Sequence, residues 1–268
     1  MHYDPIKDGL GRFFNKSTGS RKFFYKLLDL LLLRCWHIHS ELRAWLKENP
    51  NKTEVLDAGS GFGQYSFWMA NKNSKFNITS VDVKEDYLAD CSVFFKDCGL
   101  NNVKFEVGDL TNFPRKDSYD LIVCVDVMEH ILEDVEVFKH FYTNLKPGGM
   151  MLVSTPSDQG GSDVGDDSDE SFISEHVRDG YNINEIQDKL RLAGFTKTSA
   201  RYSYGTPGKI SWRLSMKYPI QMLNTSKLFY IIIPFWYLVF YPFCYILNWM
   251  DTLGSHKTGT GLIVKAWK

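Results

Sequence analysis

The sequence has little net charge and few cysteines, and each scarcity excludes a class of protein. Its 268 residues carry 31 Lys and Arg against 32 Asp and Glu, a formal net charge of −1, so we expect no nucleic-acid partner. The five cysteines form no C-x-x-C pair, which is typical of buried thiols in a reducing compartment and not of disulfides or a metal site. Residues 1–20 lack an apolar segment before a small-residue cleavage site, so we predict a cytoplasmic protein without a secretory signal.

One long stretch lacks charge altogether. Leu228–Met250 is 23 residues without a charged side chain, and ten of them are aromatic. A helix of that length would reach about 35 Å, enough for a bilayer core of roughly 30 Å. Pro234 and Pro242 argue against one straight helix. A single crossing would also leave the terminal strand predicted at Gly261–Trp267 on the opposite side of the membrane from the sheet with which it must pair.

We therefore predict that residues 205–258 form an apolar aromatic insertion that leaves a sheet and returns to it. A re-entrant or interfacial helical hairpin would do this, and so would a hydrophobic lid over the catalytic face. Arg213, Lys217 and Lys227 flank the apolar stretch, which favours a peripheral membrane contact through 228–250 at the inner face. The alternatives are a buried subdomain and a dimer interface.

The N-terminal region, residues 1–50, is basic, with nine Lys and Arg against five acidic residues. From Phe23 to Leu46 the apolar residues recur at helical spacing, with a stripe at Phe24, Leu27, Leu28, Leu31 and Leu32. Two interpretations stay open: a helix packed on the core, or a basic amphipathic helix on an anionic membrane surface.

After Pro50 the sequence alternates between strand and helix patterns, which predicts an α/β fold with a parallel sheet. The expected strands are Glu54–Ala58, Asn77–Asp82, Val103–Val107, Tyr119–Val125, Met150–Thr155, Phe195–Tyr202 and Gly261–Trp267. The expected helices are Gln64–Asn71, Glu85–Cys98, Val135–Leu145 and Asn184–Ala193. An acidic, glycine-containing segment between Ser157 and Asp179 is expected to be a solvated loop that can cover a ligand.

The residues Val55–Gly63 join the first strand to the first helix of this alternation. Gly59, Gly61 and Gly63 occupy every second position, so the backbone there can adopt positive φ and approach a ligand closely. The dinucleotide fingerprint G-x-G-x-x-G fits poorly. It requires its third glycine at position 64, where this sequence has Gln64, and the third glycine of the turn, Gly63, comes one residue earlier.

The sequence resembles the class I S-adenosylmethionine-dependent methyltransferases, with five stretches in that family's order and spacing over about residues 50–204. The carrying stretches are Val55–Gly63, Ser80–Val83, Gly108–Leu110, Tyr119–Ile131 and Leu145–Gly149. Glu175–Tyr181 is similar to a segment of bacterial members near the ubiquinone-biosynthesis O-methyltransferases. The resemblance implies a Rossmann-like, seven-stranded sheet, mostly parallel with an antiparallel last strand, and helices on both faces. It places the methyltransferase core at 51–204 and the returning strand at 259–268.

The resemblance also implies a binding site for S-adenosylmethionine as cofactor. The glycines would admit its methionine part and ribose, Asp57 would help hold its amino group, and Asp82 would accept from the ribose hydroxyls. Asp109 would accept from the adenine amino group, unless it is only a helix cap. The full set of predicted cofactor-binding residues is Asp57, Gly59, Ser60, Gly61, Gly63, Asp82, Val83, Asp109, Leu110, Asp126 and Val127.

Two histidines are the candidate catalytic residues. His130, beyond the fourth strand, is the first candidate for a general base, and His176, after the acidic segment, is the second. Either can instead be a hydrogen-bonded structural histidine. Glu129 could orient His130 or bind a cation with it, although we predict no metal site.

These observations predict methyl transfer from S-adenosylmethionine to a small-molecule or lipid-like acceptor, at or near a membrane. Two other classes remain open at this point. One is an NAD(P)-dependent oxidoreductase, which the glycine register disfavours. The other is a non-catalytic adaptor that binds the cofactor at a membrane.

Overall fold

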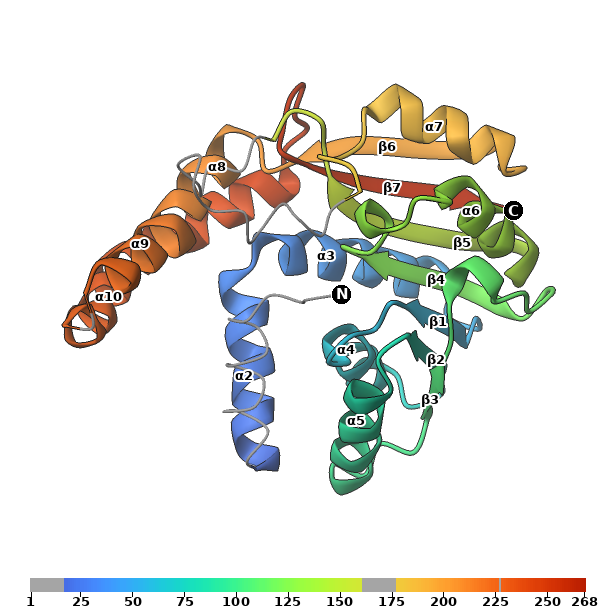
Figure 1. Ribbon diagram of the computed structural model, residues 1–268, viewed down its shortest axis with the longest axis horizontal. Helices are drawn as coiled ribbons and strands as arrows, with labels where there is room; N and C mark the ends of the chain where they lie inside the picture. Colours follow the sequence, from blue (N-terminus) through green and yellow to red (C-terminus); the bar gives the residue numbers. More distant parts are fainter. Residues whose placement is uncertain (1–16, 161–176, 227) are drawn as a thin grey trace.

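A computed structural model describes residues 17–160, 177–226 and 228–268. Within these ranges the chain forms one seven-stranded sheet in the order β3-β2-β1-β4-β5-β7-β6 (Figure 1). Strands β1 to β5 are parallel, and β7 is antiparallel to both of its neighbours. The predicted fold class is thereby confirmed. The strands are β1 (Glu54–Ala58), β2 (Asn77–Asp82), β3 (Val103–Val107), β4 (Tyr119–Val125), β5 (Leu145–Pro156), β6 (Lys197–Ser203) and β7 (Gly261–Trp267).

Five strands begin and end where the sequence predicted, and two differ. β5 starts at Leu145 because the backbones of Gly148 and Gly149 pair with Lys268 at the end of the chain. β6 starts at Lys197 and not at Phe195, because the Phe195 amide still donates to Leu190 O and closes the preceding helix. The β5 correction comes from a backbone partner far away in the sequence, whereas the β6 correction comes from a hydrogen bond that closes the preceding helix.

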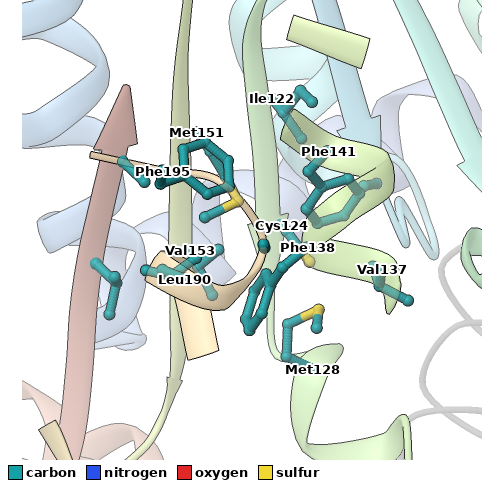
Figure 2. Close-up of a cluster of buried hydrophobic side chains, with 14 of the residues drawn as sticks. Ile122, Cys124, Met128, Val137, Phe138, Phe141, Met151, Val153, Leu190 and Phe195 are labelled. Carbon is teal, nitrogen blue, oxygen red and sulfur yellow. The ribbon is translucent and has the colours of Figure 1, made fainter. Parts of the chain in front are cut away.

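Helices cover both faces of the sheet. They are α2 (Thr18–Leu31), α3 (Leu33–Glu48), α4 (Gln64–Lys72), α5 (Glu85–Asp97), α6 (Asp134–Asn144) and α7 (Ile183–Leu192), with one-turn helices η1 (Leu110–Asn112) and η2 (Met128–His130). One face packs on α6 and α7, and Figure 2 shows this core with side chains of β4, β5, α6 and α7. The other face packs on α3 and α4 through Ile38, Leu42, Trp68 and Met69.

The helical pattern from Phe23 to Leu46 forms two helices and not one. Leu32 is extended (φ −88°, ψ 112°) and separates α2 from α3. The predicted apolar stripe of α2 is only half-buried, whereas the buried side chains of α2 are Arg21 and Tyr25. The face of α2 that packs on the protein is therefore a polar and aromatic one, which apolar periodicity could not indicate.

The segment between β6 and β7 is a helical hairpin that extends away from the sheet (Figure 1). Its outgoing arm is α8 (Thr206–Trp212), a π-helical turn η3 (Arg213–Lys217) and α9 (Tyr218–Thr225), and its returning arm is α10 (Phe229–Leu253). α10 is one continuous helix through Pro234 and Pro242. Each proline removes one backbone donor, but α10 also packs on α8, α9, η3 and α3, which hold it along its length.

Candidate functional site

The carboxyl ends of the parallel strands gather most of the predicted site residues at one edge of the sheet. Gly59, Gly61 and Gly63 follow β1 with φ of 75°, 50° and 74°. The amides of Gly59 and Ser60 donate to Val81 O at 2.8 and 2.9 Å, which fastens the turn to β2. Positive φ at three alternate residues is affordable only for glycine, so the local sequence dictates this turn.

The two faces of the glycine turn differ in how much room they leave. A Cβ on Gly59 would lie 2.3 Å from Val127 Cγ2, so glycine is required there for the close approach of Val127. A Cβ on Gly61 would meet nothing within 4 Å among the described atoms. Ser60 Oγ is buried and has no hydrogen-bond partner in the part of the chain that the structure describes. The turn thus combines an open side with an unsatisfied polar atom.

Asp82 ends β2 and faces the turn. Its Oδ2 accepts from the Gly61 amide at 2.8 Å, and its Oδ1 accepts from the Lys84 amide at 3.0 Å. Each carboxylate oxygen keeps further acceptor capacity after one hydrogen bond. Val83, the next residue, is 57% exposed and offers an apolar surface beside the carboxylate.

Asp57 lies behind the turn and not at its open side. It is 2% exposed, and its Oδ2 accepts from Ser66 Oγ at 2.6 Å. Burial raises the pKa of this carboxyl to about 6, against the lowering effect of the Ser66 hydrogen bond. The structure therefore places Asp57 where it supports the β1–α4 turn, and a direct contact with a cofactor amino group stays a prediction.

Asp109 and Leu110 follow β3. Asp109 Oδ1 accepts from the amide and the hydroxyl of Thr111 at 2.9 and 2.7 Å, so Asp109 caps η1. The cap uses Oδ1, and the side chain as a whole is exposed. Leu110 is buried beneath it. The cap and a ligand contact are compatible, because one carboxylate oxygen satisfies the helix.

Asp126, at the end of β4, has φ of 52°, an uncommon value for a residue with a side chain. Its carboxylate pairs with the Arg34 guanidinium of α3. Burial opposes the charge of Arg34, but the Asp126 carboxylate outweighs it and raises the pKa of the guanidinium. The Arg34 amide also donates to Tyr204 Oη at 3.0 Å. The sequence analysis missed Arg34 and Tyr204 as site residues.

Glu129 is the most strongly perturbed carboxyl at this edge. It is 1% exposed, and Oε2 accepts from Thr155 Oγ1 at 3.0 Å. Burial, and then the charge of Asp126, raise its pKa to about 8. A buried acid whose pKa is raised in this way is typical of functional sites. The M-E-H sequence after β4 could have indicated it, but only burial gives it this property.

His130 is half-buried on η2, directly beyond the end of β4. His176 and the acidic segment at 161–176 lie outside the described residues, so the structure does not place them. Among the residues that are described, no group of three His, Cys, Asp or Glu side chains is arranged to hold a metal ion.

Helix α2 closes over the glycine turn. Arg21 Nη2 donates to Phe62 O at 3.0 Å, and the Tyr25 hydroxyl donates to the same carbonyl. One helical turn farther along, Asp29 Oδ1 accepts from Gln64 Nε2 at 2.7 Å. Residues spaced by four share one helix face, and that spacing was the available sequence signal for this contact. α2 and α3 thus form part of the site.

Comparison with known proteins identifies the family to which this arrangement belongs. A family model described as a methyltransferase domain matches residues 49–202. Ubiquinone biosynthesis O-methyltransferase of Rickettsia akari is 26% identical over 125 residues, which cover 46% of this chain and 48% of that protein. Phosphoethanolamine N-methyltransferase 1 of Arabidopsis thaliana is 31% identical over 160 residues, covering 55% of this chain and 29% of that protein. The chain thus spans half or less of the length of these relatives.

Solved structures share the fold. Haemonchus contortus phosphoethanolamine N-methyltransferase 2 in complex with S-adenosylmethionine superimposes with a TM-score of 0.60 at 18% identity, covering 86% of this chain and 52% of that one. An S-adenosylmethionine-dependent methyltransferase from Mesorhizobium loti gives a TM-score of 0.56 at 18% identity, covering 85% and 96%. At these identities the likeness concerns the fold alone.

Proposed function

The chain belongs to the class I S-adenosylmethionine-dependent methyltransferase family, and from this premise we propose that it transfers a methyl group from S-adenosylmethionine to a small-molecule or lipid-like acceptor at or near a membrane surface. The observation that carries the proposal is the glycine turn, with its open side at Gly61, the Asp82 carboxylate beside it, and the buried Ser60 Oγ, which has no partner within the described ranges.

The residues present fit the cofactor of this family. At Gly61 the turn is open, since an added Cβ would meet no described atom within 4 Å, and Ser60 Oγ is a buried polar atom without a partner among the described residues. Asp82 can accept further hydrogen bonds at a strand end, where acids accept from ribose hydroxyls in related nucleotide sites. Val83 and Leu110 would pack on the adenine, Asp109 would accept from its amino group, and Asp126 and Val127 would face the methionine part.

S-adenosylmethionine supplies a methyl group on a sulfonium centre, which already has a good leaving group. The chain mainly has to align the acceptor and exclude water, and such alignment is worth about 7–11 kcal/mol in well-oriented reactions. Helices α2 and α3 would do part of this: Arg21 and Tyr25 of α2 contact the turn at Phe62 O, and Arg34 of α3 pairs with Asp126 at the end of β4.

A hydroxyl acceptor has to lose its proton as the bond between oxygen and the methyl group forms, and an amine that is protonated in water has to lose a proton before it can attack. We assign His130 as the base, because it lies just beyond the end of β4, with His176 as the second candidate. Glu129 would hold or receive a proton near neutral pH, since its pKa is raised to about 8 by burial and by Asp126.

The acceptor is proposed from the relatives. One acts, by its name, on the nitrogen of phosphoethanolamine, and another methylates an oxygen in ubiquinone biosynthesis. We propose for this chain an acceptor with a nitrogen or oxygen nucleophile on a small or lipid-like molecule. The proposed location is the cytoplasm, peripheral at the inner face of the membrane, with contacts through residues 228–250 and the basic N-terminal helix.

Calorimetry tests the cofactor part of the proposal. S-adenosylmethionine and S-adenosylhomocysteine should each give heat on titration, and NAD should give none. Asp82→Asn removes the charge that accepts two hydrogen bonds, so affinity should fall about ten- to a hundredfold. Asp86→Asn, on the exposed first turn of α5, is the matched control and should bind normally. Binding of NAD in place of S-adenosylmethionine would refute the proposal.

Turnover tests the catalytic part. Untargeted detection of methylated lipids and metabolites, in cells with and without the protein, would identify the acceptor. His130→Asn should then lower kcat about a hundredfold or more while cofactor affinity is kept. If His130→Asn and His176→Asn both retain full activity, the base assignment is wrong. Cofactor binding with no methylated product would favour the non-catalytic adaptor.

A further inference from the structure

The outer face of α10 is an exposed apolar surface that runs the length of the helix. α10 is the one helix in the described ranges that is long and apolar enough to cross a membrane. Only 6% of its most apolar 18-residue stretch is buried. Leu238, near its middle, is 75% exposed. Its neighbours on this face are Leu228, Ile231, Phe235, Val239, Phe243, Ile246, Trp249 and Leu253, all exposed.

The outgoing arm of the hairpin packs on α10 through small residues. Its buried residues Gly208, Ser211, Ser215 and Pro219 recur at helical spacing and face α10. Ser211 Oγ donates to Cys244 O at 3.3 Å, and Tyr237 Oη donates to Ser215 O at 2.7 Å.

Three basic residues lie along the same arm, on a different side from the residues that pack on α10. Lys209 stands two residues before Ser211 and Arg213 two residues after it, so both side chains leave the arm on a different side from Ser211. Lys217 stands two residues beyond Ser215 at the end of η3; Arg213 is exposed, and Lys209 and Lys217 are half-buried. The hairpin is thus two-sided, with apolar side chains on the outer face of α10 and basic side chains on the back of α8 and η3.

The base of the hairpin is fixed at the edge that carries the site. Ser203 ends β6 and pairs with Gly261, which begins β7 and pairs with Pro156 at the carboxyl end of β5. Near its end, α10 presents the buried Asp251, which accepts from the amides of Tyr204 and Gly208 at 3.0 and 2.9 Å. Tyr204 in turn accepts from Arg34, which pairs with Asp126.

We infer that this hairpin lies flat in one leaflet of an anionic bilayer, with the outer face of α10 among the acyl chains and Lys209, Arg213 and Lys217 at the lipid phosphates. The inference rests on the proposed membrane contact and names its partner and orientation. A crossing hairpin would carry the three cations into hydrocarbon, where charged side chains are costly, whereas a flat hairpin keeps them at the headgroups.

A bilayer also fits this face better than a second copy or another protein. Protein interfaces surround an apolar centre with a polar rim. From Leu228 to Met250 the helix has no charged side chain at all. Lipid chains accept such an uninterrupted apolar surface, and anionic headgroups complement the basic arm. Asp126 and Arg34, which the base of the hairpin contacts through Tyr204, then lie on the membrane side of the site.

Flotation of the full chain tests the docking. The protein should float with vesicles of phosphatidylcholine and phosphatidylglycerol at 3:1. Leu238→Asp places a charge on the exposed apolar face without touching the core, and should reduce vesicle binding at least tenfold. Leu192→Asp on α7, where Leu192 is 73% exposed, is the matched control and should float like the parent. Lys209→Gln with Lys217→Gln should weaken binding about fivefold per charge on these vesicles only, not on pure phosphatidylcholine.

Depth measurement tests the orientation. Four of the five cysteines are buried and Cys98 is half-buried, so the Cys98→Ser background allows labelling of single cysteines at Ile231, Leu238 and Ile246. In a flat hairpin, lipids brominated at a shallow acyl position quench bimane at all three sites equally. A label depth that increases progressively from Ile246 to Ile231 would overturn the flat orientation.

Two further outcomes would overturn the docking itself. One is flotation of Leu238→Asp like the parent. The other is a chain that stays off the vesicles and is dimeric by light scattering, with Leu238→Asp monomeric, since the face would then be a dimer interface. Calorimetry with S-adenosylmethionine on the same preparations keeps the two proposals apart, because failure to float with intact cofactor binding removes only the membrane inference.

Discussion

The Arg34 guanidinium and the Asp126 carboxylate form an ion pair between α3 and the end of β4, although 92 residues separate them in the sequence. Arg34 comes from the N-terminal region, and Asp126 from the predicted cofactor edge. The pair therefore connects the helices that cover the site to the sheet that forms it. Since the side chains are 28% and 30% exposed, the pair is partly shielded from solvent.

Arg34→Gln should destabilise the protein by about 1–3 kcal/mol, because a partly buried carboxylate loses its charged donor. Urea unfolding followed by circular dichroism measures the change. Arg191→Gln is the matched control: Arg191 pairs with Asp188 on the surface of α7 at 61% and 66% exposure, where such pairs contribute about 0–1 kcal/mol. Equal losses in the two variants would show that the Arg34 pair has no special role.

Gly59→Ala should cost more than Gly61→Ala, although both residues have positive φ. Each alanine adds about 1–2 kcal/mol of backbone strain, but only the Gly59 methyl would lie 2.3 Å from Val127 Cγ2. We expect a lower melting temperature for Gly59→Ala than for Gly61→Ala, with partial recovery in the double variant Gly59→Ala, Val127→Ala. No recovery would mean that Val127 is not the obstacle.

Tyr25→Phe should weaken cofactor binding without disturbing the core. The variant keeps the ring, which packs on Phe67 and Phe94, and loses the hydroxyl, which donates to Phe62 O of the turn and also accepts from Arg21 Nε at 2.9 Å. One hydrogen bond contributes about 0.5–1.5 kcal/mol, so the Kd for S-adenosylmethionine should rise about two- to tenfold by calorimetry. Tyr142→Phe on α6, whose ring packs on Phe195, should leave the Kd unchanged.

Glu129→Gln should change how stability depends on pH. The pKa of Glu129 is raised from 4.5 to about 8 in the folded protein, by burial first and by Asp126 second. The folded state then binds more protons than the unfolded state between those values, so stability falls as the pH rises from about 4.5 to 8. Glutamine resembles the protonated acid and removes this loss.

The melting temperature of Glu129→Gln should therefore match the parent at pH 5 and exceed it at pH 8, by at least about 2 °C. Glu136→Gln is the control. An exposed hydrogen bond from Lys139 lowers the pKa of Glu136, the opposite direction from Glu129, so Glu136→Gln should not gain stability over the parent between pH 5 and pH 8. A parent protein whose stability does not decline toward pH 8 would contradict the assignment.

The strand–helix alternation and the glycine turn were predictable because their signals are local. Alternating glycines after an apolar run specify a positive-φ turn, and β1 to β4 begin and end at the predicted residues. The same locality explains the errors. Apolar periodicity predicted one helix through Leu32, whereas the extended backbone of Leu32 separates α2 from α3.

By itself, the sequence determined the sheet, the turn at its edge and the existence of an apolar excursion that must return to β7, since each follows from residue types a few positions apart. Only the tertiary structure decided that α2 and α3 cover the turn, that Glu129 is buried beside Asp126, and that the excursion is a two-sided hairpin fixed at Asp251. These properties depend on which residues distant in the chain become neighbours, and burial and electrostatic interaction exist only once they do.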